Sequence, residues 1–473
     1  MTGPISADLA LLVPELILVS VALALILAAR RIQGSQIAVA ATVLAALAAV
    51  LVSGFSLSSG PSTAFGGMLT RDSYSQFFKI LIAASLALAA LLSVRTVDGR
   101  QVPRGEYHAL LLLASTGMML AASTLDLLTL YLSLELMTLC AYILVGITVE
   151  SPASNEAAIK YLLLGSFASA LLLFGISLTY GFAGTTDFAA IASAFSGRGP
   201  GGQPLLLVAV GLVMAGLAFK IAAVPFHTWA PDAYQGASAP VAAFLAAGFK
   251  AAGLAALGRV CLIAFGSEAE ILSLLLAGLA ALSIVVGSVV ALSQTDMKRM
   301  LAYSSIAHAG YALLGLCAGT PQGVQATMTY AFFYVFMTIG TFGVVIALGP
   351  RGETLQGYHG LAAQRPWTAA LMMLFLLALT GIPPTSGFAA KFVVILRAVS
   401  AGFVPLAVLA VACSVVSAFL YLRVVVLMYM KEPKEPEPSR FPVAISAALV
   451  VSALVTVIGG LLPGSLTPWV KAP

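Results

Sequence analysis

Long apolar runs recur along almost the whole chain and limit its possible folds more than any other feature. A helix needs roughly 20 apolar residues to cross a bilayer, and about fourteen runs of suitable length are present. They lie at 7–29, 36–57, 74–94, 106–123, 126–149, 157–183, 204–229, 239–265, 270–293, 299–319, 323–349, 367–397, 403–430 and 441–462. Only 9% of the 473 residues are charged, against about 25% in soluble domains. The sequence therefore predicts an all-α polytopic membrane protein.

Basic residues are unevenly distributed among the short loops between these runs. With the N-terminus outside, twelve lie in inner loops: Arg30, Arg31, Arg95, Arg100, Arg104, Lys298, Arg299, Arg351, Arg365, Lys431, Lys434 and Arg440. Only Arg71, Arg198, Arg397 and Lys471 lie outside. An excess of Lys and Arg in inner loops is the usual membrane topology. No basic residue precedes the first run, so we expect a retained helix rather than a signal peptide, and one transmembrane domain over 1–473.

Composition excludes several other functions. The cysteines lie singly in apolar runs, at Cys140, Cys261, Cys317 and Cys413, without the paired spacing of zinc, iron-sulfur or disulfide frameworks. We therefore expect no metal site in this chain. Membrane topology accounts for the net charge of +5 more simply than anionic partners do, and we expect no nucleic-acid partner. The polar stretch 431–440 is expected to be a solvated connector.

Three lysines lie well inside apolar runs: Lys220, Lys250 and Lys391. A lysine at mid-membrane costs about 2.5 to 3.5 kcal/mol even on the lenient insertion scale. Glu135 is the only clearly buried acidic residue that the pattern indicates. A static ion pair between helices is one interpretation. A proton relay is the other, because burial favours the neutral forms of both residue types while pairing favours the charged forms.

Prolines accompany two of these lysines. Pro225 follows Lys220, and Pro383 and Pro384 precede Lys391. Proline removes a backbone donor and leaves carbonyl groups that a membrane tolerates only beside protein or water. We therefore expect breaks in the seventh and twelfth helices. Two broken helices that lie five apart in order, each with a lysine, are typical of transporters built from inverted repeats.

Other ionisable residues give weaker signals. His227 and His308 are possible relay members because histidine titrates near neutrality, although a structural role fits either of them. Asp232 follows the first break and either caps a helix or faces a water path. Near predicted helix ends, a long basic side chain can reach the interface, as expected for Lys79, Lys160 and Arg423. Arg259 stays ambiguous.

Three stretches, FKIAAVPFHTWAPDAYQGA, MKRMLAYSSIAHAGY and GIPPTSGFAAK, closely resemble the signature motifs of the antiporter-like membrane subunits of respiratory NADH:quinone oxidoreductase, complex I. The resemblance covers about residues 10–462. It implies fourteen helices with two inverted five-helix repeats, helices 4–8 at 105–265 and helices 9–13 at 270–430, flanked by 1–104 and 441–473.

The resemblance also implies roles. Glu135 matches the fifth-helix glutamate and Lys220 the seventh-helix lysine that pairs with it. Lys250 matches the central eighth-helix lysine, and Lys391 the twelfth-helix group at the far end of the channel. Lys160 matches a sixth-helix lysine that lies near the Glu135/Lys220 pair and modulates it.

Within this family, a lysine at position 391 is unlike subunit M, which has a glutamate there. A chain ending at Pro473, about ten residues after its last run, is unlike subunit L, which continues into a long lateral helix. We therefore expect the bacterial subunit N type, in the cell inner membrane, with subunit M and the small K-type and J-type subunits as partners. The resemblance implies no cofactor in this chain, and places NADH, FMN, iron-sulfur clusters and quinone in partner subunits.

Two alternatives stay open at this point. The D-type subunit of a multi-subunit cation/proton antiporter shares the same fold and lysines. A structural membrane anchor with static ion pairs is a more distant alternative. It predicts that neutralising Glu135 and Lys220 together leaves transport intact.

Overall fold

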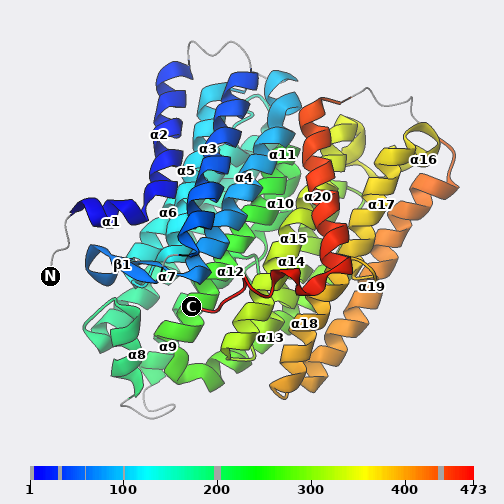
Figure 1. Cartoon of the computed structure of the whole chain (residues 1–473). Coiled ribbons are helices and arrows are strands. Elements are labelled where there is room, and N and C mark those ends of the chain that lie inside the picture. Colours follow the sequence, from blue (N-terminus) through cyan, green and yellow to red (C-terminus); the bar gives the residue numbers. More distant parts are fainter. Residues whose placement is uncertain (1–4, 30–34, 59, 100–101, 197–203, 435–440) are drawn as a thin grey trace.

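The computed structural model describes residues 5–29, 35–58, 60–99, 102–196, 204–434 and 441–473. Helices make up nearly all of it (Figure 1). The longer ones are α2 (Val13–Ala28), α3 (Ser35–Ser56), α4 (Ser73–Gly99), α5 (Arg104–Ser123), α6 (Leu127–Val145), α7 (Pro152–Ala183), α9 (Pro204–Lys220), α12 (Lys250–Arg259), α13 (Ala269–Ala291), α14 (Met297–Leu316), α15 (Pro321–Leu348), α17 (Pro366–Thr380), α18 (Ser386–Ser400), α19 (Val404–Met430) and α20 (Val443–Leu461).

Shorter helices complete the chain: α1 (Ile5–Leu11), α8 (Phe188–Ser196), α10 (Trp229–Gly236), α11 (Ala239–Phe244) and α16 (Leu361–Gln364). The π-helical turns η3 (Leu245–Phe249) and η4 (Val260–Ala264) flank α12. The 3₁₀ turns are η2 (Phe65–Gly67), η5 (Gly266–Glu268), η6 (Gly349–Glu353), η7 (Leu355–Tyr358) and η8 (Pro463–Leu466).

Each predicted apolar run overlaps at least one of these helices. Within the described ranges, nine helical spans are long and apolar enough to cross a membrane, and α2, α9 and α17 are shorter apolar helices. The expectation of an all-α membrane protein is thereby confirmed. The count of fourteen crossings and the inverted repeat stay predictions. Of the predicted loop charges, Arg30, Arg31, Arg100, Arg198 and Arg440 lie outside the described residues, as does 435–440 of the polar connector.

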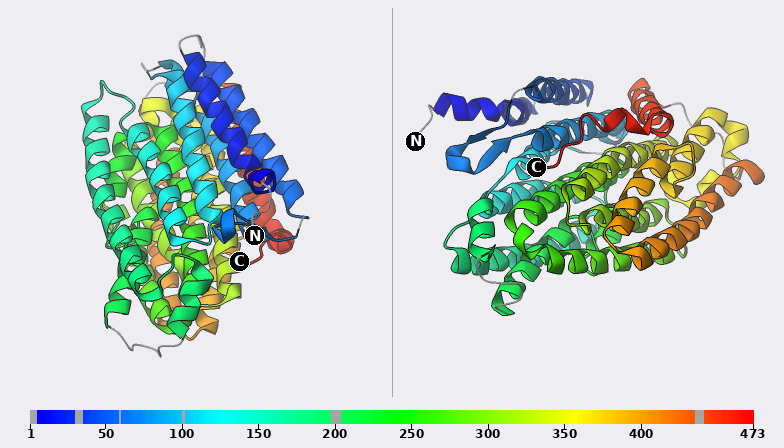
Figure 2. Two further views of the ribbon diagram at one scale, coloured as in Figure 1. Left: turned by 90° about the vertical axis from the view of Figure 1, so that its left-hand side faces the viewer. Right: turned by 60° about the horizontal axis from the view of Figure 1, so that its bottom comes forward.

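The helices form a bundle with a separate layer along one flank. Helices α2, α3, α4 and α20, together with the C-terminal segment, make up this layer (Figure 2). Within the bundle, α11 to α12 and α15 are the most enclosed spans. Such burial on all sides explains why these spans are apolar around their whole circumference. The lysines and the glutamate singled out from the sequence are carried by the bundle, on α6, α9, α12 and α18.

A small β-hairpin interrupts the helical pattern. Strand β1 (Ser62–Ala64) pairs antiparallel with β2 (Leu69–Arg71), with Thr63 opposite Thr70. The amide of Leu125 donates to the carbonyl of Met68, which ties the hairpin to the turn between α5 and α6. The hairpin therefore closes one end of the bundle over these helices.

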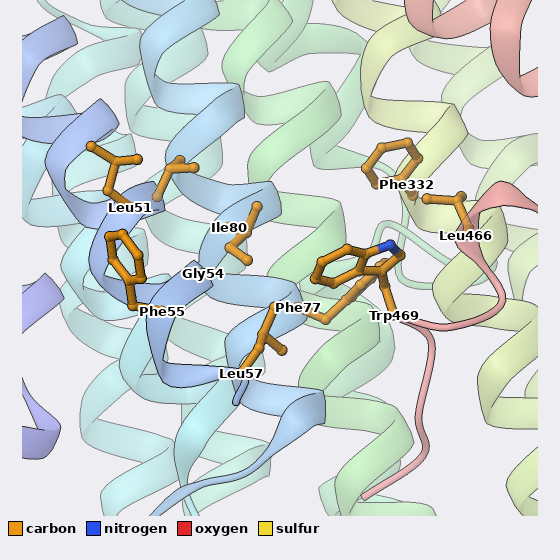
Figure 3. A pocket seen from close by; sticks show the side chains of 10 residues that line it. Leu51, Gly54, Phe55, Leu57, Phe77, Ile80, Phe332, Leu466 and Trp469 are labelled. Atoms are coloured by element: carbon orange, nitrogen blue, oxygen red, sulfur yellow. The ribbon is translucent and has the colours of Figure 1, made fainter. Parts of the chain in front are cut away.

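An apolar groove of about 530 Å³ opens between α3, α4, α15 and the C-terminal segment (Figure 3). It is lined by Val50, Leu51, Gly54, Phe55, Leu57, Phe77, Ile80, Phe332, Leu466 and Trp469. None of these side chains is charged, so the groove is a hydrocarbon surface separate from the buried lysines.

A buried ion pair ties two helices of the flank layer together. The Lys79 Nζ atom on α4 lies 2.8 Å from Oε1 of Glu15 on α2, and the two side chains are 1% and 4% exposed. Lys79 does not reach the interface, and Glu135 is not the only buried acidic residue, so both expectations are wrong. The burial of Glu15 was not predicted because this residue lies in the first turn of α2. Acidic residues at that position are usually exposed and stabilise the helix end.

Loss of one partner of this pair should destabilise the protein. Glu15→Ala leaves the Lys79 ammonium buried without a counter-charge, which costs about 3–5 kcal/mol in comparable pairs. We expect a lower temperature for heat-induced dissociation of the purified assembly. The double variant Glu15→Leu/Lys79→Leu should be close to the parent, because two apolar side chains replace two charges. Equal heat stability of the Glu15→Ala variant and the parent would contradict this view of the pair.

Candidate functional site

Glu135 and Lys220 form an ion pair between α6 and α9. The Lys220 Nζ atom lies 3.4 Å from Oε1 of Glu135, and the lysine side chain is 1% exposed against 21% for the glutamate. Lys220 also donates to the hydroxyl groups of Thr138 at 3.3 Å and Ser169 at 3.4 Å. Ser169, on α7, donates to the same Glu135 oxygen. The pair is therefore held by hydroxyl groups that can stabilise either charge.

The chain leaves the helix directly after Lys220 and is non-helical until Trp229. Pro225 lies in this stretch. Protein groups satisfy part of the freed backbone: the Val224 amide donates to the Ser283 hydroxyl at 2.9 Å, and the Trp229 indole donates to the Phe219 carbonyl at 3.0 Å. A break inside the membrane is tolerated when protein satisfies it in this way.

Lys250 begins α12 directly after the π-helical turn η3. Its ammonium is buried and donates to the backbone carbonyl of Ser305 on α14. The Ser305 hydroxyl in turn donates to the phenol of Tyr234, on α10, at 3.4 Å. The central lysine is therefore attached to α14 by a neutral acceptor, and no acidic residue within hydrogen-bond distance of it is found among the described residues.

His308 lies on α14 one turn beyond Ser305. Its Nδ1 atom is 2.6 Å from the phenol oxygen of Tyr330 on α15. The rings of Tyr311 and Tyr334 also lie against the imidazole, with ring centroids 6.0 and 5.1 Å away. The histidine is therefore enclosed by aromatic rings of α14 and α15.

Lys391 occupies the second helix break. Helix α17 ends at Thr380, Pro383 and Pro384 follow, and α18 begins at Ser386. The lysine donates to the Thr380 carbonyl at 2.8 Å and to the Ser414 hydroxyl at 2.9 Å. Its ammonium thus satisfies a carbonyl at the end of α17.

The ring of Tyr311 covers Lys391 from the α14 side, with the Nζ atom 4.4 Å from the ring centroid. A cation over an aromatic face at this distance is attracted by the ring. Helix α14 consequently touches both Lys250 and Lys391: the Ser305 backbone carbonyl accepts from Lys250, and the Tyr311 ring lies against Lys391. His308 lies between Ser305 and Tyr311 on α14. It is three residues from each of them, and residues three apart are neighbours on a helix surface.

A cavity of about 10 Å³ lies beside this helix face. It is lined by Leu301, Ser304, Tyr334, Thr338, Thr341, Phe342 and Leu379. The Tyr334 phenol and the Thr338 hydroxyl are buried and have no hydrogen-bond partner among the residues that the structure describes. The volume is close to the roughly 10–15 Å³ that one water molecule needs. These groups are therefore suited to hold one water molecule between α14, α15 and α17.

Two of the predicted residues are not joined to this arrangement. Lys160 is 46% exposed and binds Glu156 at 2.7 Å and Asp232 at 3.3 Å. Within the described part of the chain it makes no ion pair or hydrogen bond with Glu135 or Lys220. Asp232 also binds Arg299 at 2.6 Å. His227 lies in the first break, and its buried Nδ1 has no partner among the described residues.

Sequence reasoning did not find the hydroxyl and aromatic groups of the site. These are Thr138, Ser169, Ser305, Ser414, Tyr234, Tyr311, Tyr330 and Tyr334. The stretch YSSIAHAGY contains a signal in retrospect, because Ser305, His308 and Tyr311 follow one another at three-residue spacing. The serines elsewhere give no such signal, because hydroxyl groups in apolar helices often bond to their own backbone, as Ser115 does with the Leu111 carbonyl.

Residues 124–418 match the family described as NADH:quinone oxidoreductase/Mrp antiporter, TM. The NADH-quinone oxidoreductase subunit N of Desulfovibrio desulfuricans is 44% identical, over 99% of this chain and 97% of that protein. Subunit N 2 of Rhizobium meliloti is 43% identical over 95% and 94%. This chain belongs to the subunit N family of NADH-quinone oxidoreductase. The sequence-based assignment to the subunit N type is confirmed.

This chain is also similar in structure to chains of several solved membrane complexes. A chain of respiratory complex I from Thermus thermophilus superposes with a TM-score of 0.84 at 35% identity, covering 97% of this chain and 99% of that one. A chain of the archaeal membrane-bound sulfane sulfur reductase gives 0.85 at 27% identity, over 98% and 96%. A chain of the Mrp complex from a Dietzia species gives 0.84 at 22% identity, over 98% and 96%, and shares the fold. A subunit N family member is a membrane-arm subunit of complex I.

Proposed function

We propose that this chain translocates protons in the membrane arm of NADH:quinone oxidoreductase through Glu135, Lys220, Lys250 and Lys391. One observation carries the proposal: α14 presents Ser305 to Lys250 and Tyr311 to Lys391, with His308 between them. Three lysines buried in one bundle are costly in a membrane protein. The polar groups that lie between Lys250 and Lys391 favour a proton path as the function of these costly residues.

In this mechanism, a proton from the inner side loads Lys250, passes along the α14 face, and leaves from Lys391 to the outer side. Lys220 controls the transfer by its charge. Paired with Glu135, it is neutralised; when the pair separates, its positive charge lowers the proton affinity of Lys250 by repulsion. Two charges about 7 Å apart interact by roughly 2 kcal/mol at an effective dielectric of about 20, which shifts a proton equilibrium more than tenfold.

The geometry supports separate parts of this proposal. Ser169 and Thr138 can bind Lys220 when Glu135 moves away, and the small cavity beside Ser304 and Tyr334 gives a water molecule a place near His308. The resemblance also implies a modulating role for Lys160, and His227 is a further possible member of the relay because histidine titrates near neutrality. The contact of Lys160 with Asp232 favours a peripheral role for it. We further propose that the N-terminus is outside, in a bacterial inner membrane, and that the two inverted repeats are 105–265 and 270–430.

The redox chemistry belongs to other subunits in this proposal. NADH, FMN, iron-sulfur clusters and quinone are bound by partner chains, and the membrane neighbours are subunit M and the K-type and J-type subunits. This chain contributes ionisable side chains that hold and pass protons. Energy reaches it through the arrangement of the neighbouring membrane subunits, which sets whether the Glu135–Lys220 pair is closed or open.

A cation/proton antiporter subunit is the second candidate, because the matched family includes Mrp antiporters. Purification of the assembly in mild detergent through a C-terminal tag separates the two candidates. We expect flavin and iron-sulfur subunits to co-purify with NADH:quinone activity, and proton uptake or release to follow NADH addition in proteoliposomes. An assembly of membrane subunits without redox activity, which exchanges Na⁺ for protons, would contradict the proposed function.

A further inference from the structure

The ammonium group of Lys220 is shared among three acceptors rather than closed on one. Its Nζ atom lies 3.4 Å from Oε1 of Glu135, 3.4 Å from the Ser169 hydroxyl and 3.3 Å from the Thr138 hydroxyl. A hydrogen bond between an ammonium and a carboxylate is usually about 2.7–2.9 Å long. The ion pair is therefore loose, and two neutral oxygens hold the lysine beside it.

Two other buried lysines show how such sharing goes with a longer contact. Lys79 makes no ion pair or hydrogen bond except with Glu15 among the described residues, and that contact is 2.8 Å. Lys298 is shared between Glu353, at 3.3 Å, and a backbone carbonyl between α10 and α11, at 3.1 Å. The 3.4 Å contact of Lys220 thus belongs to a shared ammonium, which keeps other partners when its carboxylate leaves.

Ser169 is the one described side chain that bonds to both ions of the pair. Its hydroxyl donates to Oε1 of Glu135 and accepts from Lys220. Thr138 cannot do the same, because its hydroxyl donates to the Leu134 carbonyl at 2.9 Å and has only lone pairs left for the lysine. A serine hydroxyl has one proton and two lone pairs, so it can bind a carboxylate and an ammonium at once.

Close packing of α7 against α9 keeps Ser169 beside Lys220. Ser169 is 5% exposed and lies near the middle of α7. A Cβ atom added to Gly175 of α7 would lie 2.7 Å from the backbone of α9, and one added to Gly216 of α9 would lie 2.5 Å from a side chain of α7. The Glu135 side chain is 21% exposed, against 1% for the lysine. The glutamate is therefore the partner with room to move away.

The hydroxyl of Ser169 reduces the cost of such a movement. A buried ion that loses its partner is strongly destabilising, and a hydrogen bond that stays on the ion offsets part of this cost. Ser169 can keep accepting from Lys220 or keep donating to Glu135 as the two ions separate. Without it, Glu135 has no hydrogen-bond partner except Lys220 among the described residues. The pair would then close more tightly and open less readily.

We propose that Ser169 is a positioning residue that keeps the Glu135–Lys220 pair able to open, because its hydroxyl bonds to both ions. The inference rests on the proposed function of this pair. A structural role, in which Ser169 only holds α7 to its neighbours, is the alternative. That role would affect the complex whether or not Lys220 is present.

The test uses Ser169→Ala in the intact complex, reconstituted in proteoliposomes. We expect NADH-driven pumping and NADH:quinone activity to fall about fivefold or more, because hydrogen bonds to charged groups are among the stronger ones. Ser169→Cys keeps a donor that is weaker than a hydroxyl and should fall between the two. Ser115→Ala is the matched control, since the buried Ser115 hydroxyl donates to the Leu111 carbonyl of its own helix. Parental rates in Ser169→Ala would overturn the proposal.

The double variant Ser169→Ala/Lys220→Ala separates positioning from packing. With the lysine gone no pair is left to open, so the serine change should alter the residual NADH:quinone activity of Lys220→Ala by less than about twofold. A further fivefold loss in that background would also overturn the proposal. If Ser169→Ala does not assemble, Ser169→Cys provides the same comparison. Parental pumping by Lys220→Ala alone would contradict the proposed function instead, so the two failures are distinguishable.

Discussion

Replacement of Lys250 by methionine is expected to abolish proton pumping by the assembled complex and to slow NADH:quinone activity at least tenfold. Methionine fills a similar volume with a flexible apolar chain, so the packing around α12 survives. What is lost is the one ionisable group that binds the Ser305 carbonyl. The measurement is NADH-driven acidification or alkalinisation in proteoliposomes, with NADH oxidation followed in parallel.

Lys431→Met is the matched control for this experiment. Lys431 is exposed at the end of α19, and its replacement should leave both rates unchanged. A Lys250→Met complex that contains all its subunits and pumps at the parental rate would remove Lys250 from the mechanism.

Lys220→Ala is expected to reduce pumping and NADH:quinone activity about tenfold or more while the complex still assembles. The remaining Glu135 carboxylate keeps a hydrogen bond from Ser169 and is partly exposed, so its charge is not stranded. In the proposed mechanism the positive charge of Lys220 lowers the proton affinity of Lys250, and this variant lacks that charge. Purified yield and subunit content measure assembly, and proteoliposomes measure pumping.

The double variant Glu135→Gln/Lys220→Met tests whether the ion pair takes part in proton transfer or only holds the two helices together. If the pair only holds α6 to α9, two neutral side chains should replace it without loss of transport, because breaking a buried pair is costly mainly when one charge is left alone. If the pair acts by changing its charge separation, the double variant should be as inactive as Lys220→Ala. Parental pumping in the double variant would favour the structural anchor.

Several features of the site followed from residue type and position alone. Lys220, Lys250 and Lys391 stood out because a lysine inside an apolar run is costly whatever surrounds it. The prolines near two of them indicated interrupted helices without any knowledge of packing. In the structure the chain leaves the helix at Lys220 and again at Thr380, although Lys391 fills its break and Lys220 turns away towards Glu135.

Partners could not be predicted in the same way. Lys79 and Lys160 looked alike as lysines near helix ends, yet one is buried against Glu15 and the other is exposed beside Asp232. The contacts that distinguish them join residues 64 and 72 positions apart in the chain. No local pattern records such a contact, because it depends on which helices pack side by side.

The amino-acid sequence by itself determined the helical membrane fold, because each long apolar run in a bilayer must satisfy its own backbone hydrogen bonds. It also singled out the few lysines inside apolar runs, because a charge there is costly. Only the tertiary structure decided which group each charged side chain contacts. It put Lys250 against a carbonyl, Lys391 under an aromatic ring, and Arg259 against Asp72. These contacts depend on the packing of helices distant in sequence, so basic side chains that look alike in the sequence meet different partners in the structure.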